Sequence, residues 1–175
     1  MKTVVLYKSK TGFTKKYADW IAGELAADLY ESSQITIEEI TTYDTVIYGG
    51  GLYIIGINGV ELITQNLAKL QGKKIVVFGV GASPGREEEI REVQDANFTL
   101  EQQQQIRFFY LRGGYDYHKL KPVDKVLMIL LKWKIKLKPK TKLTADERGM
   151  LAAYQHPADF TRKKNIEELI AYVTS

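Results

Sequence analysis

Three hydroxyl side chains follow the first apolar run of the chain at short spacing. Ser9, Thr11 and Thr14 surround Gly12. They follow the apolar residues 4–7 and Lys8, and a helical repeat of apolar residues comes after them. A phosphate placed there would meet the N–H groups at the start of a helix, the positive end of the helix dipole and three hydroxyl donors. We therefore expect a phosphate-binding loop. The alternative is a hydroxyl-rich cap on an ordinary helix.

The sequence of this loop distinguishes between the known kinds of phosphate site. It is not a Walker A loop, which ends in Gly-Lys-Ser/Thr, nor the dinucleotide motif with three glycines. It matches Ser/Thr-x-Thr-Gly-x-Thr, and on this motif the chain resembles the flavodoxins, in which the loop holds the phosphate of FMN. The resemblance implies FMN as the cofactor. Its implied phosphate site consists of Ser9, Lys10, Thr11, Gly12, Phe13 and Thr14.

A second glycine-rich segment follows the strand expected at residues 44–48. The resemblance implies that this loop borders the isoalloxazine ring, where glycines make a peptide rotation inexpensive and Tyr53 stacks on the ring or flanks it. The implied contacts are Gly50, Gly51, Leu52 and Tyr53. The alternative is a tight turn with a surface tyrosine.

A third loop of small residues follows the strand expected at residues 73–80. The resemblance implies that it packs on the other side of the flavin and offers backbone donors to its pyrimidine edge. The implied contacts are Gly81, Ala82, Ser83 and Pro84. The alternative is a plain strand-to-helix turn. Flavodoxins often carry an aromatic residue in this loop, and its absence here predicts one open ring face that suits a substrate or a quinone.

The elements that must position these loops alternate along the chain. The expected strands span residues 3–7, 35–40, 44–48, 73–80 and 106–111, and the expected helices span residues 13–29, 60–70, 86–93, 100–105 and 162–173. This alternation predicts an α/β fold with a parallel sheet and right-handed crossovers. We expect a flavodoxin-like three-layer sandwich: a five-stranded parallel sheet of order 2-1-3-4-5, with helices on both faces and the ligand at the carboxyl ends of the strands. A single domain is expected over residues 1–175.

A basic amphipathic insert is expected at about residues 115–142. Nine lysines and one acid lie between residues 119 and 142, and such a stretch favours an anionic partner. Pro122 suits the start of a helix, and the apolar residues that follow it have helical spacing. After Lys132, lysines alternate with Trp133, Ile135 and Leu137. The segment is therefore either a helix that becomes extended or a helix with a mixed surface.

The insert narrows the resemblance to one subgroup. The pattern Leu111-Arg112-Gly113, Tyr117, Lys119, Asp124-Lys125 and the apolar residues 126–131 is similar to that of the menaquinone-dependent protoporphyrinogen dehydrogenases. This resemblance implies a porphyrinogen as the reduced substrate and a quinone as the electron acceptor. The insert would then meet lipid headgroups or porphyrin propionates with its lysines, or it is an extra helix packed on the domain. Arg112 would contact an anionic substrate or the flavin, or form a structural ion pair.

Composition excludes several kinds of chemistry. The 175 residues include no cysteine and two histidines, which excludes disulfides and thiolate ligands, and we expect no metal site. Paired carboxylates at convincing spacing and a nucleophile elbow are both lacking, so the catalytic side chains stay unknown. Lysines interleaved with aromatics also suit nucleic acid, but without a recognisable binding fold we expect none as a partner.

The sequence thus favours an FMN-dependent oxidoreductase that passes electrons from a reduced substrate to a quinone. The alternatives are a one-electron carrier between redox proteins, a non-enzymatic module that has kept the fold, and a nicotinamide-dependent quinone reductase, for which no nicotinamide signature is found. The first apolar run is too short for a secretion signal, and none reaches the length of a membrane span. We expect a cytoplasmic protein that is peripheral at the inner face of the membrane if the insert binds lipid.

Overall fold

The computed structural model describes residues 2–116, 122–144, 147–149, 151 and 157–175. Within them, a parallel sheet runs in the order β2-β1-β3-β5-β6. Its strands are β1 Thr3–Lys8, β2 Asp28–Glu31, β3 Thr45–Tyr53, β5 Lys74–Gly81 and β6 Ile106–Arg112. Counted in chain order without the short β4, this is the predicted order 2-1-3-4-5. The strand β4, Gly56–Ile57, pairs antiparallel with the end of β3.

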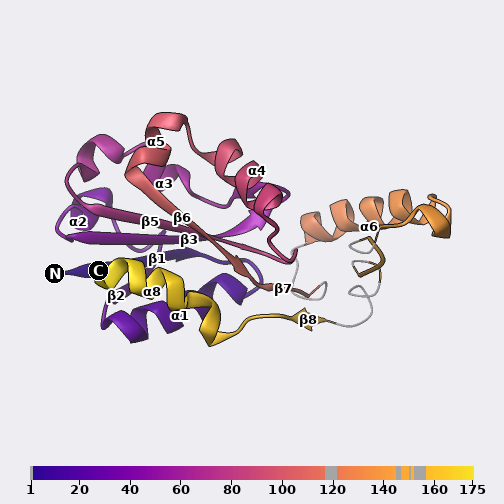
Figure 1. The fold of residues 1–175 in the computed structure, drawn as a ribbon, viewed down its shortest axis with the longest axis horizontal. Coiled ribbons are helices and arrows are strands. Elements are labelled where there is room, and N and C mark those ends of the chain that lie inside the picture. Colours follow the sequence, from indigo (N-terminus) through magenta and orange to yellow (C-terminus); the bar gives the residue numbers. More distant parts are fainter. Residues whose placement is uncertain (1, 117–121, 145–146, 150, 152–156) are drawn as a thin grey trace.

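Helices cover both faces of this sheet, as predicted (Figure 1). One face carries α1 (Phe13–Leu25), the 3-10 helix η4 (Lys163–Ile166) and α8 (Glu167–Thr174). The other carries α2 (Ile37–Ile40), α3 (Glu61–Thr64), η1 (Leu67–Leu70), α4 (Glu87–Asn97) and α5 (Leu100–Gln105). Alternate strand residues enter the two cores: Val46 and Tyr48 pack on the α3 side, and Ile47 packs on the α1 side. This alternation is the two-residue period of a strand covered on both faces.

The predicted second strand, residues 35–40, is wrong. Residues 37–40 form α2, because Thr36 and Glu39 make a reciprocal cap. The Thr36 Oγ1 accepts from the N–H of Glu39 at 3.3 Å, and the Glu39 carboxylate accepts from the N–H of Thr36 at 2.8 Å. Such a capping box starts a helix and excludes extended backbone there.

The strand on the outer side of β1 is instead β2, which overlaps the predicted end of the first helix at residues 28 and 29. Helix α1 stops at Leu25, since Ala26 takes a left-handed backbone with φ of 47°. Leu29, predicted on the apolar face of that helix, is therefore a strand residue opposite Val5. An apolar residue at this position fits either element, so its spacing alone could not separate them.

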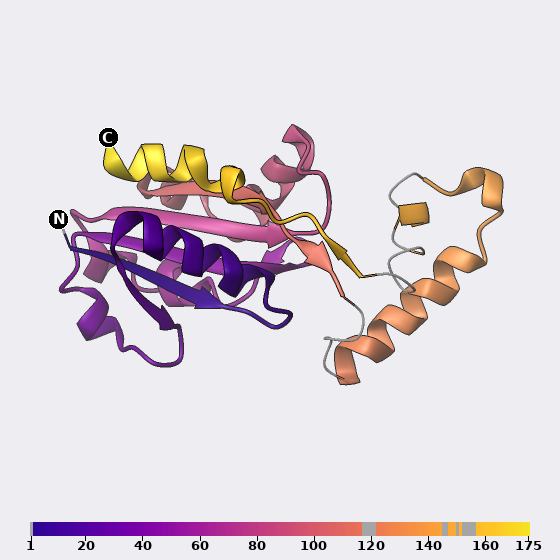
Figure 2. The ribbon, with the colours of Figure 1, turned by 90° about the horizontal axis from the view of Figure 1, so that it is seen from below.

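After β6, the chain leaves the sandwich at the carboxyl edge of the sheet and returns to it before η4. We call this part of the chain, residues 114–159, the excursion. The short strand β7, Gly114–Tyr115, pairs antiparallel with β8, Ala158–Asp159. Between them, α6 (Pro122–Lys136) and the 3-10 helix η3 (Lys140–Lys142) lie beyond the strand ends (Figures 1 and 2). The predicted helix start at Pro122 is confirmed. The helical alternative also holds, because the helix continues to Lys136 instead of becoming extended after Lys132.

Two residues of the subgroup pattern, Tyr117 and Lys119, lie outside the described residues. Among the helices that the structure describes, none is both long and apolar enough to cross a bilayer.

Candidate functional site

The three segments predicted to hold the cofactor meet at the carboxyl edge of the sheet (Figure 2). Lys8, the last residue of β1, pairs with Gly50 in β3, and Gly51 pairs with Val80 near the end of β5. Because the three strands are parallel neighbours, the segments that follow them share one end of the sandwich. The edge is the one beyond which α6 lies.

The first loop turns directly into α1. Gly12 is the N-cap residue, with φ of 93° and ψ of −18°, a left-handed conformation that favours glycine. Its N–H donates to the Ser9 hydroxyl at 3.1 Å. Within the described part of the chain, no side chain caps the N-terminus of α1, so the alternative of a hydroxyl cap is not what the loop forms. A phosphate monoester would complete this helix start.

Thr14 brings the first loop against the end of β3. It is 3% exposed, and a Cβ placed on Gly51 would lie 3.4 Å from its Oγ1. The missing side chain of Gly51 therefore leaves space beside a hydroxyl of the first loop. A second contact joins the same two segments, since the ammonium nitrogen of Lys10 lies 3.8 Å from the centre of the Tyr53 ring.

The second segment was predicted to be a loop, and this prediction is wrong. Residues 49–53 form the last part of β3. Close neighbours fill the space that side chains would take: the Phe78 ring lies against Gly49, and a Cβ on Gly50 would lie 2.8 Å from the carbonyl oxygen of Asn58. Pairing with β4 extends the strand to Tyr53. Packing accounts for glycine at Gly49 and Gly50, while Gly51 faces the first loop.

Tyr110, on β6, fixes the third loop through hydrogen bonds to Ser83. The tyrosine hydroxyl donates to the Ser83 carbonyl at 2.9 Å and bonds the Ser83 hydroxyl at 2.8 Å. Burial raises the pKa of Tyr110, so its hydroxyl keeps its proton at neutral pH. The N–H of Gly113 donates to the Gly81 carbonyl at 2.7 Å. Ala82 and Pro84 are exposed, and Leu52 packs against Gly81 from β3.

Arg112, the last residue of β6, lies beside the residue that follows β8. Its guanidinium carbon is 3.9 Å from the centre of the Phe160 ring. Among the described residues it forms no ion pair, and its buried Nε–H has no partner. The described residues therefore do not support the alternative that Arg112 forms a structural ion pair. Sequence spacing carries no signal for Phe160, because this contact joins segments far apart in the chain.

Tyr17 fixes the end of β6 from the α1 side. Its hydroxyl donates to the Arg112 carbonyl at 2.6 Å and accepts from the side-chain amide of Asn165 at 2.7 Å. Burial raises the pKa of Tyr17, so the hydroxyl keeps the proton that it donates to the Arg112 carbonyl. Helical periodicity predicts Tyr17 only as a residue of the apolar face. The hydroxyl contacts depend on how α1 packs, and periodicity does not show that.

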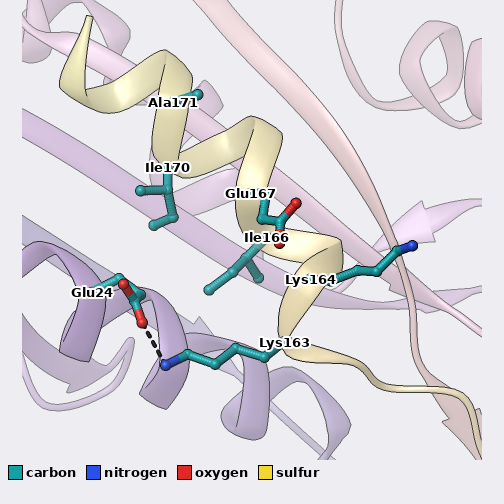
Figure 3. Close-up of a pocket in the computed structure, with 7 residues that line it drawn as sticks. All are labelled: Glu24, Lys163, Lys164, Ile166, Glu167, Ile170 and Ala171. Atoms are coloured by element: carbon teal, nitrogen blue, oxygen red, sulfur yellow. Dashed lines mark ion pairs between the residues drawn. The ribbon is translucent and has the colours of Figure 1, made fainter.

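A separate hollow of about 470 Å³ lies between α1 and the segment η4–α8 (Figure 3). Ile166 and Ile170 form its apolar floor, and the ion pair between Glu24 and Lys163 crosses one end. It shares no residue with the three segments above. The hollow is therefore not a candidate for the phosphate site. Within the described residues, no group of three or more His, Asp or Glu side chains is gathered as metal ligands are.

The family model described as a flavodoxin domain matches residues 4–142 of this chain. The chain belongs to the flavodoxin-domain family. This domain identifies the cofactor as FMN, and the loop at Gly12 fits a phosphate monoester because its helix start is uncapped by side chains and its walls carry hydroxyls.

Individual proteins are also similar to this flavodoxin-domain protein in sequence or in structure. A curated, uncharacterized protein of Methanocaldococcus jannaschii is 41% identical over 54 residues, which is 30% of this chain and 36% of the relative. The match thus spans about a third of that protein. A WrbA-like flavodoxin from Agrobacterium tumefaciens is 19% identical, with a TM-score of 0.50 over 71% of this chain and 87% of its own. The two-electron reduced flavodoxin of Megasphaera elsdenii is 18% identical, with a TM-score of 0.45 over 62% and 84%.

Proposed function

We propose that this flavodoxin-domain protein is an FMN-dependent oxidoreductase that takes electrons from a reduced, anionic aromatic substrate and passes them to a quinone. The observation that carries the proposal is where the basic excursion is attached. Its strands β7 and β8 pair beside the phosphate loop: a Cβ on Gly114 would lie 2.6 Å from the Phe13 ring. The excursion thus leaves the domain beside the loop that we propose for the phosphate, and its lysines suit anionic and membrane-borne reactants.

FMN, when bound, supplies the transfer of one or two electrons, and the protein positions it. We assign the phosphate to the N-terminus of α1 and to the hydroxyls of Ser9, Thr11 and Thr14. The ring would lie between the end of β3 and the third loop. Neutral donors suffice for the phosphate, since the positive charge of Lys10 rests on the Tyr53 ring. The residues assigned to the ring are Gly51, Leu52, Tyr53, Gly81, Ala82, Ser83 and Pro84.

Two features favour a small-molecule reaction over electron transfer between proteins. The third loop presents Ala82 and Pro84, without an aromatic side chain to cover the ring from that side. Arg112 lies at the same edge of the sheet and has hydrogen-bonding capacity left, because its Nε–H has no partner among the described residues. We assign it to the carboxylates of the substrate, since a guanidinium binds them in a two-point geometry. The reaction would resemble that of the menaquinone-dependent protoporphyrinogen dehydrogenases.

The test is anaerobic turnover of the FMN-loaded protein with a porphyrinogen as donor and a naphthoquinone as acceptor, followed by the visible flavin spectrum. We expect quinone-dependent formation of the oxidised porphyrin. Arg112→Gln should raise KM for the porphyrinogen acid by about tenfold, the loss of one charge-assisted pair, and leave KM for its methyl ester unchanged. Lack of any quinone-dependent oxidation, with rapid reduction of a redox protein instead, would show the protein to be a one-electron carrier.

A further inference from the structure

Helix α6 carries an apolar stripe that the described part of the chain leaves uncovered. Its members are Val126, Ile129, Leu130, Trp133 and Leu137, and each side chain is between 41% and 82% exposed. They recur at intervals of three and four residues, so at 100° per residue they fall on one face of the helix. Leu137 continues this face, because its N–H still donates to the Trp133 carbonyl at 3.1 Å. We call these five residues the α6 stripe.

One described residue of α6 opposite the α6 stripe is buried. Ile135, about half a turn from the α6 stripe, is 4% exposed. The helix is therefore packed at Ile135 and presents the α6 stripe on the other side. Exposed leucines and a tryptophan gathered on one face indicate a binding surface, whereas single exposed apolar residues do not.

Lysines border the α6 stripe along both sides. At 100° per residue, Lys125, Lys132 and Lys136 fall on one flank, and Lys134 and Lys138 fall on the other. Residues 125–142 contain no acid. Lys138 pairs with Glu147 at 2.6 Å, while Lys134 and Lys136 are exposed. A hollow of about 360 Å³ runs along one flank, lined by Ile129, Lys132, Trp133, Lys136 and Leu137.

From this arrangement we infer that α6 docks on the surface of an anionic lipid bilayer, with the α6 stripe in the headgroup boundary and the lysines on the lipid phosphates. An apolar face rimmed by lysines, with a tryptophan at its centre, is the pattern of helices that lie in a membrane interface. Fifteen residues that include several lysines are too few and too charged to cross the bilayer. A second copy of the chain is the poorer occupant, because pairing two such helices would bring lysines against lysines.

Docking through α6 also deepens the proposed function, on which this step rests. Helix α6 lies beyond the carboxyl edge of the sheet, where the FMN segments meet (Figures 1 and 2). An anchored α6 therefore keeps that edge close to the bilayer, which is where a hydrophobic quinone resides. The docking itself needs no turnover, so it can be measured whether or not the quinone reaction holds.

Trp133 is a built-in reporter of docking. The chain has two tryptophans, and Trp20 packs edge-on against Tyr17 with ring centres 5.5 Å apart. In the full-length FMN-loaded Trp20→Phe variant, emission comes from Trp133. The probes are vesicles of phosphatidylcholine alone and vesicles with phosphatidylcholine and phosphatidylglycerol in equal parts. With the mixed vesicles we expect co-sedimentation, a blue shift of the emission and quenching by brominated acyl chains. Added salt should reverse the binding.

Paired variants separate the two parts of the surface. Leu130→Ser with Leu137→Ser should weaken partitioning by at least about tenfold, and Lys134→Gln or Lys136→Gln should each weaken it about fivefold. The matched control is Leu100→Ser on α5, an 80% exposed leucine that should change nothing. Circular dichroism checks that each variant is folded. The proposal is overturned if wild-type protein ignores both vesicles or binds both equally, or if Trp133 is shielded in a concentration-dependent dimer.

Discussion

The ammonium nitrogen of Lys10 lies 3.8 Å from the centre of the Tyr53 ring, and this contact joins the loop proposed for the phosphate to the end of β3. The ring is 40% exposed, so the contact belongs to a partly solvated surface where a cation on a ring contributes about 0.5–1 kcal/mol. It holds together two segments that are assigned to opposite ends of the same cofactor.

Replacing Tyr53 tests that contact. Tyr53→Leu removes the ring and should weaken FMN binding by about three- to fivefold. Tyr53→Phe keeps the aromatic face and should bind FMN within about twofold of the wild type. The measurement is titration of the FMN-free protein by quenching of flavin fluorescence. Equal losses in the two variants would show that the hydroxyl, not the ring, matters.

Gly51 and Gly50 form a matched pair with opposite expectations. A Cβ at Gly51 would enter the space beside the Thr14 hydroxyl at an ordinary contact distance of 3.4 Å. Gly51→Ala should therefore leave the unfolding free energy of the FMN-free protein within about 0.5 kcal/mol but lower FMN affinity by about tenfold or more.

In Gly50→Ala, the new methyl would meet the backbone of Asn58 and the side chain of Ile57. We expect a loss of about 2 kcal/mol in unfolding free energy, as for an overpacked core. Urea unfolding and FMN titration of both variants check the pair. A stable Gly51→Ala protein that binds FMN normally would place the cofactor away from Thr14.

Tyr110→Phe tests whether the third loop must be held rigid. The change removes both hydrogen bonds to Ser83 and should lower the unfolding free energy by about 1 kcal/mol. Because burial keeps the Tyr110 hydroxyl protonated, the loss should be the same from pH 6 to about pH 9. Ser83→Ala should be milder, since the Ser83 carbonyl still accepts. A loss that grows with pH would show that the tyrosine ionises.

The anchoring of the excursion should depend on pH through Asp159. Its carboxylate accepts from the Lys16 ammonium at 2.9 Å and from the N–H of Thr161 at 2.8 Å. Partial burial raises the pKa of Asp159, but the hydrogen bonds from Thr161 and Lys16 outweigh it and hold the pKa below its ordinary value. A lowered folded-state pKa gives stability above the unfolded value of about 4, which is lost as the pH falls through the folded value.

Asp159→Asn should therefore lower the unfolding free energy at pH 7 by about 0.5 kcal/mol, a small figure because the pair is half exposed to solvent. The difference should vanish as the pH falls from about 7 through the folded-state pKa of Asp159. Urea unfolding across this range measures it, with Lys15→Met on the separate Lys15–Asp19 pair as control. A difference that persists at low pH would mean that the substitution removes more than a charge.

Much of this protein is determined by local sequence. The loop from Ser9 to Thr14 needs only its own residues and a helix after it, so its motif alone predicts a phosphate site. The strands β1 and β5 contain continuous apolar runs, residues 4–7 and 75–78, which fit a sheet covered on both faces. Their alternation with helices then sets the strand order and gathers the loops at one edge.

Tertiary structure decided what distant segments do to one another. The capping box at Thr36 is a local signal, but β2 forms only because β1 offers it a parallel neighbour. The sequence does not distinguish Gly50 from Gly51, which are neighbouring glycines. In the structure, Asn58 fills the space beside Gly50, whereas Thr14 borders the space beside Gly51. The α6 stripe is apolar in sequence like any core helix. Only the fold shows that Ile135 is buried while Trp133 faces outward, because burial depends on what packs against a helix and not on its own periodicity.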